Sequence, residues 1–359
     1  MEKKKIVHIV EAFGGGVFTY FVELANALSE NFEVVIAYAK RPQTPEDFKD
    51  YFNKNIKLVE IKNFTRSINP IKDFKACIEV NKLIKEEKPD IVHMHSSKAG
   101  IIGRIMISSK NRKIFYTPHG YAFLKQDDSK LKRLIYKIIE KATALIRRSC
   151  KIVACSKGEY EESLKILKNS TYINNGINNK EIDKLVNKAN KNKVDLNNLK
   201  ICTIGRIGYQ KNPELFNKIA EQFPNIQFTW IGDGELRDCL TSENIQITGW
   251  KDRKEVLNEL EKNDIFILPS LWEGLPIALL EAMYLEKICI VSNVIGNKDV
   301  IENAKNGFVC DGLEDYIEVI KQIQNGKYNL DEIENNANSD ILKEYNVGVM
   351  SRKYEELYA

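Results

Sequence analysis

Two glutamates stand eight residues apart in the segment at 269–283, PSLWEGLPIALLEAM. Glu273 lies in a glycine-containing loop, and Glu281 lies inside the apolar helix expected to begin near Pro276, a natural first helical residue. A carboxylate flanked by apolar residues is costly to bury without a partner. Paired hydroxyl groups, such as those of a ribose, are suitable partners, and the loop amides could face a sugar or a phosphate. This segment is the most specific chemical pattern in the chain.

A second pattern, GRIGYQKN at 205–212, follows a strand-like apolar run. Arg206 and Lys211 flank its loop, where a guanidinium can bind a diphosphate in a bidentate fashion and an ammonium acts as a point charge. A solvated pair is the ordinary alternative, but it would be an odd feature directly after a buried strand. The next predicted strand ends in a second glycine turn at 232–235.

A third pattern is the run of three glycines at 14–16, between a predicted strand and a predicted helix. Glycine lets the backbone pass close to a ligand, and a helix start presents free N–H groups to an anion. The run does not match GxGxxG, so it does not indicate a dinucleotide site.

Three of the four histidines, His93, His95 and His119, also belong to these loops or strands. His93 and His95 alternate along a strand and share one face. We expect no zinc site, because no third ligand lies at a plausible spacing, and a strand histidine is usually a satisfied core residue. His119 precedes a glycine after a strand, so a donor there could bind a hydroxyl or stabilise developing charge.

The elements that must position these residues are short β-rich runs separated by segments of helical period, which is typical of βα units around parallel sheets. We expect an α/β protein with two doubly wound, Rossmann-like domains, the first at 1–178 and the second at 200–340, with a linker at 179–199 between them and a last helical segment at 341–359. Ligands of such folds bind beyond the carboxyl ends of the strands. The predicted strands are 4–12, 56–63, 90–97, 113–120, 151–158 and 170–177 in the first half, and 200–207, 226–234, 245–250, 264–270, 288–294 and 307–312 in the second.

The composition agrees with two ordinary globular domains, since the 359 residues are 43% hydrophobic and 29% charged. It excludes a disordered chain, a fibre and a small disulfide scaffold. No apolar run approaches the roughly 20 residues of a membrane-spanning helix, and the N-terminus makes a poor signal peptide. Seven scattered cysteines without a CxxC pair indicate reduced thiols. We expect a soluble cytoplasmic protein.

The net charge of +4 conceals an asymmetry. Residues 1–180 carry 33 Lys and Arg against 20 Asp and Glu, and the remainder carries 21 against 30. The basic half has a helix at 130–148 with an apolar stripe and a dense cationic remainder. The stripe is expected to pack on the sheet as in an ordinary amphipathic helix, while the cations could rest on an anionic membrane, making the protein peripheral on its inner face. Nucleic acid is not expected, because no recognised motif for it is present.

With these residues in view, the chain resembles the family 4 glycosyltransferases, retaining enzymes of the GT-B fold, over nearly its whole length. The resemblance is greatest to the branch that builds bacterial capsule and surface polysaccharides. It rests on the glycine run, HSSKAG, TPHG, INNGIN, GRIGYQKN, IGDGE, the Glu-x7-Glu element EGLPIALLE and a late Asn-Gly.

The resemblance implies a hexosyl- or N-acetylhexosaminyltransferase that moves a sugar from a nucleotide-diphosphate sugar to a lipid-linked (polyprenyl diphosphate) or oligosaccharide acceptor. It implies that the domain at 1–178 binds the acceptor, that the domain at 200–340 binds the nucleotide sugar, and that the helix at 341–359 packs back on the first domain. It implies that Arg206 and Lys211 hold the diphosphate, that Glu281 binds the ribose, and that Glu273 and His119 contact the donor sugar. The expected donor-binding residues are Gly15, Gly16, Gly205, Arg206, Lys211, Gly232, Trp250, Glu273, Gly274, Leu275, Pro276 and Glu281.

No Asp-x-Asp occurs in the chain, so neither a metal nor another cofactor is expected. Positive side chains and helix N-termini must then neutralise the leaving nucleoside diphosphate. No carboxylate pair suits double displacement, and we expect front-side transfer through an oxocarbenium-like state. A uridine nucleotide is the expected donor and guanosine the alternative. Two other functions stay open: a sugar-nucleotide epimerase of the same fold, or a non-catalytic partner that binds a sugar nucleotide for another transferase.

Overall fold

The computed structural model describes residues 3–65, 69–186 and 194–359, and the chain divides into two compact units. The first unit comprises Met1–Gly176 together with Val347–Ala359, and the second comprises Ile177–Asn346. The linker expected at 179–199 differs from this division. Its parts at 179–186 and 194–199 belong to the second unit, and its remaining residues lie outside the described ones.

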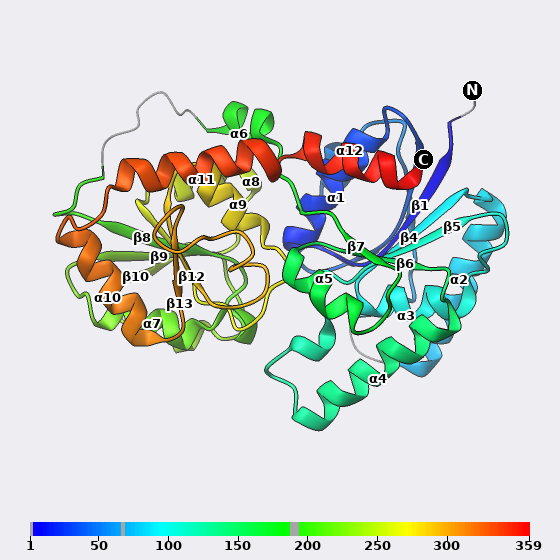
Figure 1. Cartoon of the computed structure of the whole chain (residues 1–359), viewed down its shortest axis with the longest axis horizontal. Helices are drawn as coiled ribbons and strands as arrows, with labels where there is room; N and C mark the ends of the chain where they lie inside the picture. Colours follow the sequence, from blue (N-terminus) through cyan, green and yellow to red (C-terminus); the bar gives the residue numbers. More distant parts are fainter. Residues whose placement is uncertain (1–2, 66–68, 187–193) are drawn as a thin grey trace. The chain divides into compact units, whose positions relative to one another are not determined.

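The first unit contains a seven-stranded parallel sheet in the order β3-β2-β1-β4-β5-β6-β7 (Figure 1). The order reverses between β1 and β4, and crevices at such points are where open α/β sheets bind ligands. Its strands are β1 (Lys5–Phe13), β2 (Glu33–Lys40), β3 (Lys57–Glu60), β4 (Ile91–His95), β5 (Lys113–Thr117), β6 (Lys151–Ala154) and β7 (Ser170–Tyr172).

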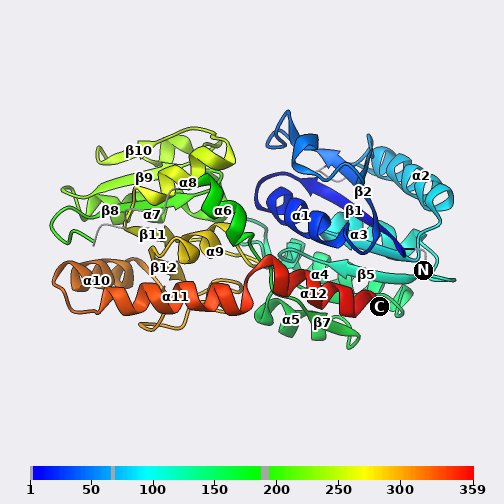
Figure 2. The same ribbon diagram turned by 90° about the horizontal axis from the view of Figure 1, so that it is seen from above.

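Helices cover both faces of this sheet. The α1 and α12 helices pack against each other on one face, whereas α2, α3 and α4 contribute to the hydrophobic core on the other (Figures 1 and 2). The last helix of the chain is therefore part of the first unit. The helices are α1 (Gly15–Leu28), α2 (Pro70–Glu87), α3 (Ser97–Met106), α4 (Lys130–Ile146), α5 (Lys157–Leu164) and α12 (Val347–Tyr358), with short 3-10 turns at Phe48–Tyr51 and Ala122–Leu124.

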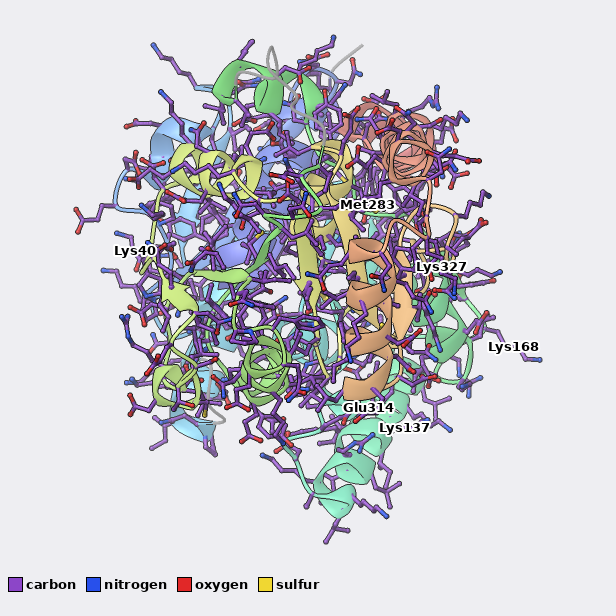
Figure 3. All side chains as sticks on the ribbon, turned by 90° about the vertical axis from the view of Figure 1, so that its left-hand side faces the viewer. Lys40, Lys137, Lys168, Met283, Glu314 and Lys327 are labelled. Carbon is purple, nitrogen blue, oxygen red and sulfur yellow. The ribbon has the colours of Figure 1, made fainter. Side chains whose placement is uncertain are left out.

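The second unit contains a six-stranded parallel sheet in the order β10-β9-β8-β11-β12-β13, which reverses between β8 and β11. Its helix α9 is almost wholly buried, including Met283, which Figure 3 labels. The strands are β8 (Lys200–Ile204), β9 (Gln227–Ile231), β10 (Ile245–Ile247), β11 (Ile265–Leu268), β12 (Ile288–Ser292) and β13 (Phe308–Cys310). The helices are α6 (Asn179–Leu185), α7 (Pro213–Glu221), α8 (Arg253–Glu261), α9 (Ile277–Tyr284), α10 (Leu313–Gln324) and α11 (Leu330–Glu344), with 3-10 turns at Tyr209–Lys211 and Arg237–Cys239.

The strands form where the sequence has continuous apolar runs, because a parallel sheet covered by helices buries both of its faces. In β11, for example, all four residues are buried. Each predicted strand corresponds to an observed one, but the structure adds β2, which the predicted set lacks. The α/β fold with two doubly wound domains is confirmed.

Helix α4 corrects one expectation, because its apolar stripe does not pack on the sheet. The helix instead buries Glu140, Thr143 and Ala144. Glu140 forms an ion pair of 2.6 Å with the fully buried Arg104 of α3 and accepts a hydrogen bond of 3.0 Å from the hydroxyl of Tyr116. The exposed residues are Leu131, Leu134, Ile135, Ile138, Leu145 and Ile146.

We predict that Glu140→Ala destabilises the protein by roughly 3–5 kcal/mol, because it leaves the buried guanidinium of Arg104 without its charge partner. Equilibrium denaturation by urea measures the loss. The matched control is Glu161→Ala, which removes an exposed carboxylate of the neighbouring α5. Equal stability of the two variants would show that the buried ion pair does not anchor α4.

Candidate active site

The carboxyl ends of β8 and β11, where the strand order of the second sheet reverses, bring two of the predicted loops together. Lys211 Nζ lies 2.7 Å from Glu273 Oε1, and both side chains are largely buried. Gln210 donates hydrogen bonds from Nε2 to the carbonyl oxygen of Trp272 (2.9 Å) and to Glu273 Oε2 (3.3 Å). The loop after β8 is thus joined to the loop after β11 through both oxygens of one carboxylate.

Arg206 lies at the same edge but is more exposed. Its guanidinium forms two parallel hydrogen bonds to Glu235, at 2.8 Å from Nε and 2.7 Å from Nη2. An exposed pair of this kind contributes little stability. A diphosphate that entered this edge could therefore replace Glu235 as the partner of Arg206 at small cost.

Glu281 is buried in α9 and has the partner that its position requires. Arg253, at the start of α8, donates from Nη1 to Glu281 Oε1 at 2.6 Å, and its Nε lies 3.8 Å from a carboxylate oxygen of Glu181. Arg253 is not among the residues predicted from the sequence. Arg253 is hard to recognise in the sequence as a functional residue, because an arginine after the Asp252 cap of a helix is common on protein surfaces.

The helix start after Glu273 adds backbone donors to this edge. Helix α9 begins at Ile277 and has no side-chain cap, so its first amides and its dipole favour an anion there. The loop before it is tightly packed: a Cβ atom on Gly296 would lie 2.3 Å from the carbonyl oxygen of Gly274.

The other predicted donor contacts have different settings. A Cβ atom on Gly232 would lie 2.2 Å from the carbonyl oxygen of Gly205, so this glycine is required by the packing of one loop on another. The side chain of Trp250 is 57% exposed. Leu275 and Pro276 are buried between Glu273 and α9.

In the first unit, the glycine run lies at the carboxyl end of β1, next to the reversal of strand order. Gly15 and Gly16 begin α1, whose N-terminus has no side-chain cap. The same edge holds an ion pair between Glu11 and Arg41, which the sequence analysis missed. Glu11 lies near the end of β1 and Arg41 directly follows the neighbouring β2, and the omission of β2 from the predicted set concealed their proximity.

His119 follows β5 at this edge, in a constrained turn. Its φ of +52° is unusual for a residue with a side chain and costs on the order of 1–2 kcal/mol. The turn is held by the buried Glu159, which accepts hydrogen bonds from the amides of Gly120 (2.6 Å) and Cys155 (2.8 Å). Burial lowers the pKa of His119 to about 3, so its imidazole is neutral at physiological pH.

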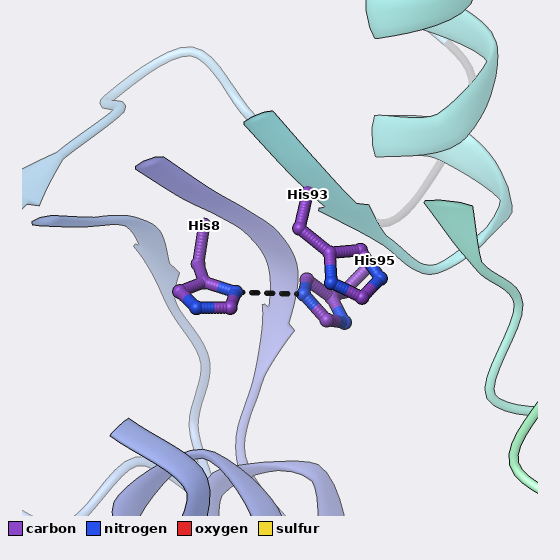
Figure 4. Close-up of side chains that lie close together, drawn as sticks. All are labelled: His8, His93 and His95. Atoms are coloured by element: carbon purple, nitrogen blue, oxygen red, sulfur yellow. Dashed lines mark hydrogen bonds between the residues drawn. The ribbon is translucent and has the colours of Figure 1, made fainter. Parts of the chain in front are cut away.

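The other histidines lie directly beside His119. The expectation that no third ligand accompanies His93 and His95 is wrong, because His8 of β1 pairs in register with His93 of the adjacent β4 (Figure 4). Both ring nitrogens of His93 and of His95 are used in hydrogen bonds. Burial lowers the pKa of His8 to about 3 and the pKa values of His93 and His95 well below their usual range.

The structure thus places the predicted residues in two sets. In the second unit, it joins Lys211 to Glu273 and places Arg206 and the loop before α9 at the same edge of the sheet, while Glu281 pairs with Arg253. In the first unit, it places the glycine run and His119 at the carboxyl edge of the sheet. Cations and helix N-termini opposite buried carboxylates are suited to a ligand that carries both a diphosphate and sugar hydroxyls.

Two family models match the chain. The model described as Glycosyltransferase Family 4 matches residues 14–181, and the model described as Glycosyl transferases group 1 matches residues 184–340. The two matches meet close to the boundary between the two units.

Similar proteins include characterised glycosyltransferases. The chain is 32% identical to UDP-Gal:alpha-D-GlcNAc-diphosphoundecaprenol alpha-1,3-galactosyltransferase of Escherichia coli, over 86% of this chain and 85% of the relative. It is 26% identical to an alpha-1,4-N-acetyl-D-galactosaminyltransferase of Campylobacter jejuni whose named substrate is a diNAcBac-PP-undecaprenol glycan, over 86% and 85% of the two chains.

Solved structures share the fold across the whole chain. Sucrose-phosphate synthase from Thermosynechococcus elongatus has a TM-score of 0.80 at 16% identity and covers 99% of this chain and 98% of that one. Anabaena HepE, solved in complex with UDP and glucose, has a TM-score of 0.75 at 14% identity and covers 99% of each chain.

The chain belongs to glycosyltransferase family 4. It is a glycosyltransferase of the GT-B type, as its resemblance to that family implied. No helix in the described ranges is both long and apolar enough to cross a membrane.

We predict that Gly296→Ala weakens the binding of a nucleoside diphosphate by at least about tenfold, because the new methyl group displaces the loop that carries Glu273. Isothermal titration calorimetry measures the affinity. Gly312→Ala is the control, since a Cβ atom there meets no heavy atom within 4 Å. An unchanged affinity in Gly296→Ala would exclude the loop before α9 from the binding site.

Proposed function

We propose that this glycosyltransferase transfers a sugar from a UDP-sugar to a hydroxyl group of a lipid-linked acceptor, with retention of configuration and without a metal ion. The observation that carries the proposal is the junction of Lys211, Gln210 and Glu273 beside the start of α9. The E. coli relative uses UDP-Gal and an undecaprenyl-diphosphate acceptor, by its name. The proposed pathway is bacterial surface polysaccharide synthesis.

In the proposed reaction, the donor diphosphate lies against Arg206, Lys211 and the N-terminus of α9. These groups supply positive charge as the sugar–phosphate bond breaks, which is the role that a metal ion has in other transferases. Lys211 is held by Glu273 before the donor binds, so the charge is already placed. The leaving phosphate oxygen then accepts the proton of the acceptor hydroxyl.

The remaining predicted residues complete the donor site in this proposal. Glu281 binds the ribose hydroxyls while Arg253 holds its carboxylate, and Glu273 contacts the donor sugar. His119 also contacts that sugar. Gly15 and Gly16 approach the phosphate or the acceptor.

We further propose that the first unit binds an anionic membrane through α4. This helix exposes an apolar stripe, and the buried Glu140 anchors it to the unit through Arg104 and Tyr116. Cationic side chains flank the stripe, including Lys137, which Figure 3 labels. An interfacial helix that combines an apolar face with lysine and arginine binds anionic lipid surfaces, which is where a polyprenyl-diphosphate acceptor resides.

The donor assignment is tested by measuring UDP release from a panel of UDP- and GDP-sugars in the presence of a chelator, with and without a lipid-diphosphate acceptor analogue. We expect slow release from one UDP-sugar, faster release with acceptor, and an α-linked product from an α-linked donor. Conversion of the donor to an isomer without release would identify an epimerase. Binding without release or transfer would identify a non-catalytic partner.

The same assay tests Glu273. Glu273→Gln is expected to lower kcat by about 100-fold, because the carboxylate that faces the reacting sugar is lost. Glu243→Gln, which removes an exposed carboxylate of the same unit, is the matched control and should leave the rate unchanged. Near-normal turnover of Glu273→Gln would show that this carboxylate takes no part in the reaction.

The membrane proposal predicts that the protein co-sediments with phosphatidylglycerol vesicles more strongly than with phosphatidylcholine vesicles. Replacement of Leu134 and Ile138 together by glutamate should lower the bound fraction severalfold. Leu342→Glu, at an exposed apolar residue of the second unit, should not. Binding that survives both the double replacement and charge reversal of the lysines of α4 would refute the proposal.

A further inference from the structure

The four histidines of the chain lie together under α1 and α12, and three of them form a line. His8 Nδ1 lies 3.0 Å from His95 Nε2, a contact drawn in Figure 4. His95 Nδ1 lies 3.0 Å from His119 Nε2. The remaining histidine, His93, is outside this line, because its ring nitrogens contact the hydroxyls of Tyr358 (2.5 Å) and Thr117 (2.8 Å).

The line connects the buried interior of the sheet with the ligand edge. His8 and His95 are fully buried, and His119 is partly exposed in its turn. Aromatic rings of α1 hold the imidazoles in place: Phe21 contacts His95 edge to face at 4.5 Å between ring centroids, and Tyr20 contacts His119 at 4.8 Å. The rings therefore have little freedom to rotate away from one another.

The number of protons in the line allows only two arrangements of its hydrogen bonds. Burial lowers the pKa values of all three histidines, so each ring is neutral and carries one N–H. Each of the two contacts needs one donor and one acceptor. If His8 donates to His95, then His95 must donate to His119, and His119 keeps its own proton on Nδ1. In the opposite direction, His119 donates from Nε2 to His95, and its own Nδ1 carries no proton and can only accept a hydrogen bond.

The inner end of the line distinguishes these two arrangements. His8 Nε2 is buried and has no hydrogen-bond partner among residues 3–65, 69–186 and 194–359. The inward direction would place the proton of His8 on this atom, as a buried donor without an acceptor. The outward direction leaves only an unused lone pair there. Orphaned buried N–H groups are rarer in proteins than under-used acceptors.

We infer that His8 and His95 are positioning residues that hold His119 in the tautomer protonated on Nδ1, so that this glycosyltransferase presents a hydrogen-bond donor, and not an acceptor, at the ligand edge of its first unit. His119 Nδ1 has no protein partner within the described residues, which leaves it for a ligand. The partner of such a donor is an oxygen atom of a sugar hydroxyl or of a phosphate. The identity of that ligand rests on the proposed function, whereas the tautomer does not.

The inference is tested on the full chain without substrate, by NMR of protein labelled with 15N in the histidine rings and kept with a chelator. The chain has only four histidines, and His119→Asn assigns the signals of His119. We expect protonated Nδ1 and bare Nε2 in His8, His95 and His119. A proton on Nε2 of His119, or a cationic ring at pH 7, would overturn the inference.

Variants of His95 test the coupling through the line. His95→Asn keeps an N–H near the position of Nδ1 and should preserve the His119 tautomer. His95→Phe removes the donor, so the tautomer of His119 should no longer be fixed. His93→Gln is the control outside the line and should leave the His119 signals unchanged. A His119 tautomer that is the same in His95→Phe as in the wild type would show that His95 does not set it.

Activity then separates this inference from the proposed function. With the accepted donor, His95→Phe should lower kcat at least about tenfold while the KM for acceptor changes little, and His95→Asn should restore most of the rate. An enzyme that transfers no sugar but shows the expected tautomers would contradict the proposed function alone. Full activity in His95→Phe together with a changed tautomer would overturn the role of the tautomer in the reaction.

Discussion

The ion pair between Lys211 and Glu273 is the interaction on which the arrangement of the second unit's site depends. It joins the loops after β8 and β11, which start from neighbouring strands but are separated by about sixty residues of chain. Both groups are largely removed from water, so each needs the other while no ligand is present. A ligand with a diphosphate can compete for Lys211, and the carboxylate is then left to face the sugar hydroxyls. In the proposed reaction, this ion pair therefore holds both charges in place before the donor binds.

The sheets explain why the charged residues of the predicted loops lie at the ends of strands. A parallel sheet with helices on both faces buries most of its strand residues, so the polar residues of the two sites collect where strands end and helices begin. The reversal of strand order separates the two flanking loops at this edge and opens the space for a ligand. In the second unit, Arg206, Lys211 and Glu273 follow the two strands that flank the reversal, and in the first unit the predicted glycine run follows β1 beside it.

Much of this arrangement could be predicted from the sequence, because it is encoded locally. The apolar runs identify the strands, and the loop residues Arg206, Lys211, Glu273 and His119 follow them directly. What could not be predicted depends on contacts that are distant in sequence. Arg253 meets Glu281 only after α8 and α9 have packed, and His8 meets His95 only when β4 pairs with β1.

Helix α4 shows a different limit on what can be predicted from a sequence. Its periodicity correctly indicates which residues share a face, but not which face is turned inward. Which face of α4 is turned inward depends on Arg104 of α3, because this buried cation requires a carboxylate at close range. Glu140 supplies it from the polar side of α4, and the apolar side is turned outward as a consequence. The same pairing of charges that satisfies the interior of the first unit therefore creates the exposed apolar stripe that we assign to a lipid surface.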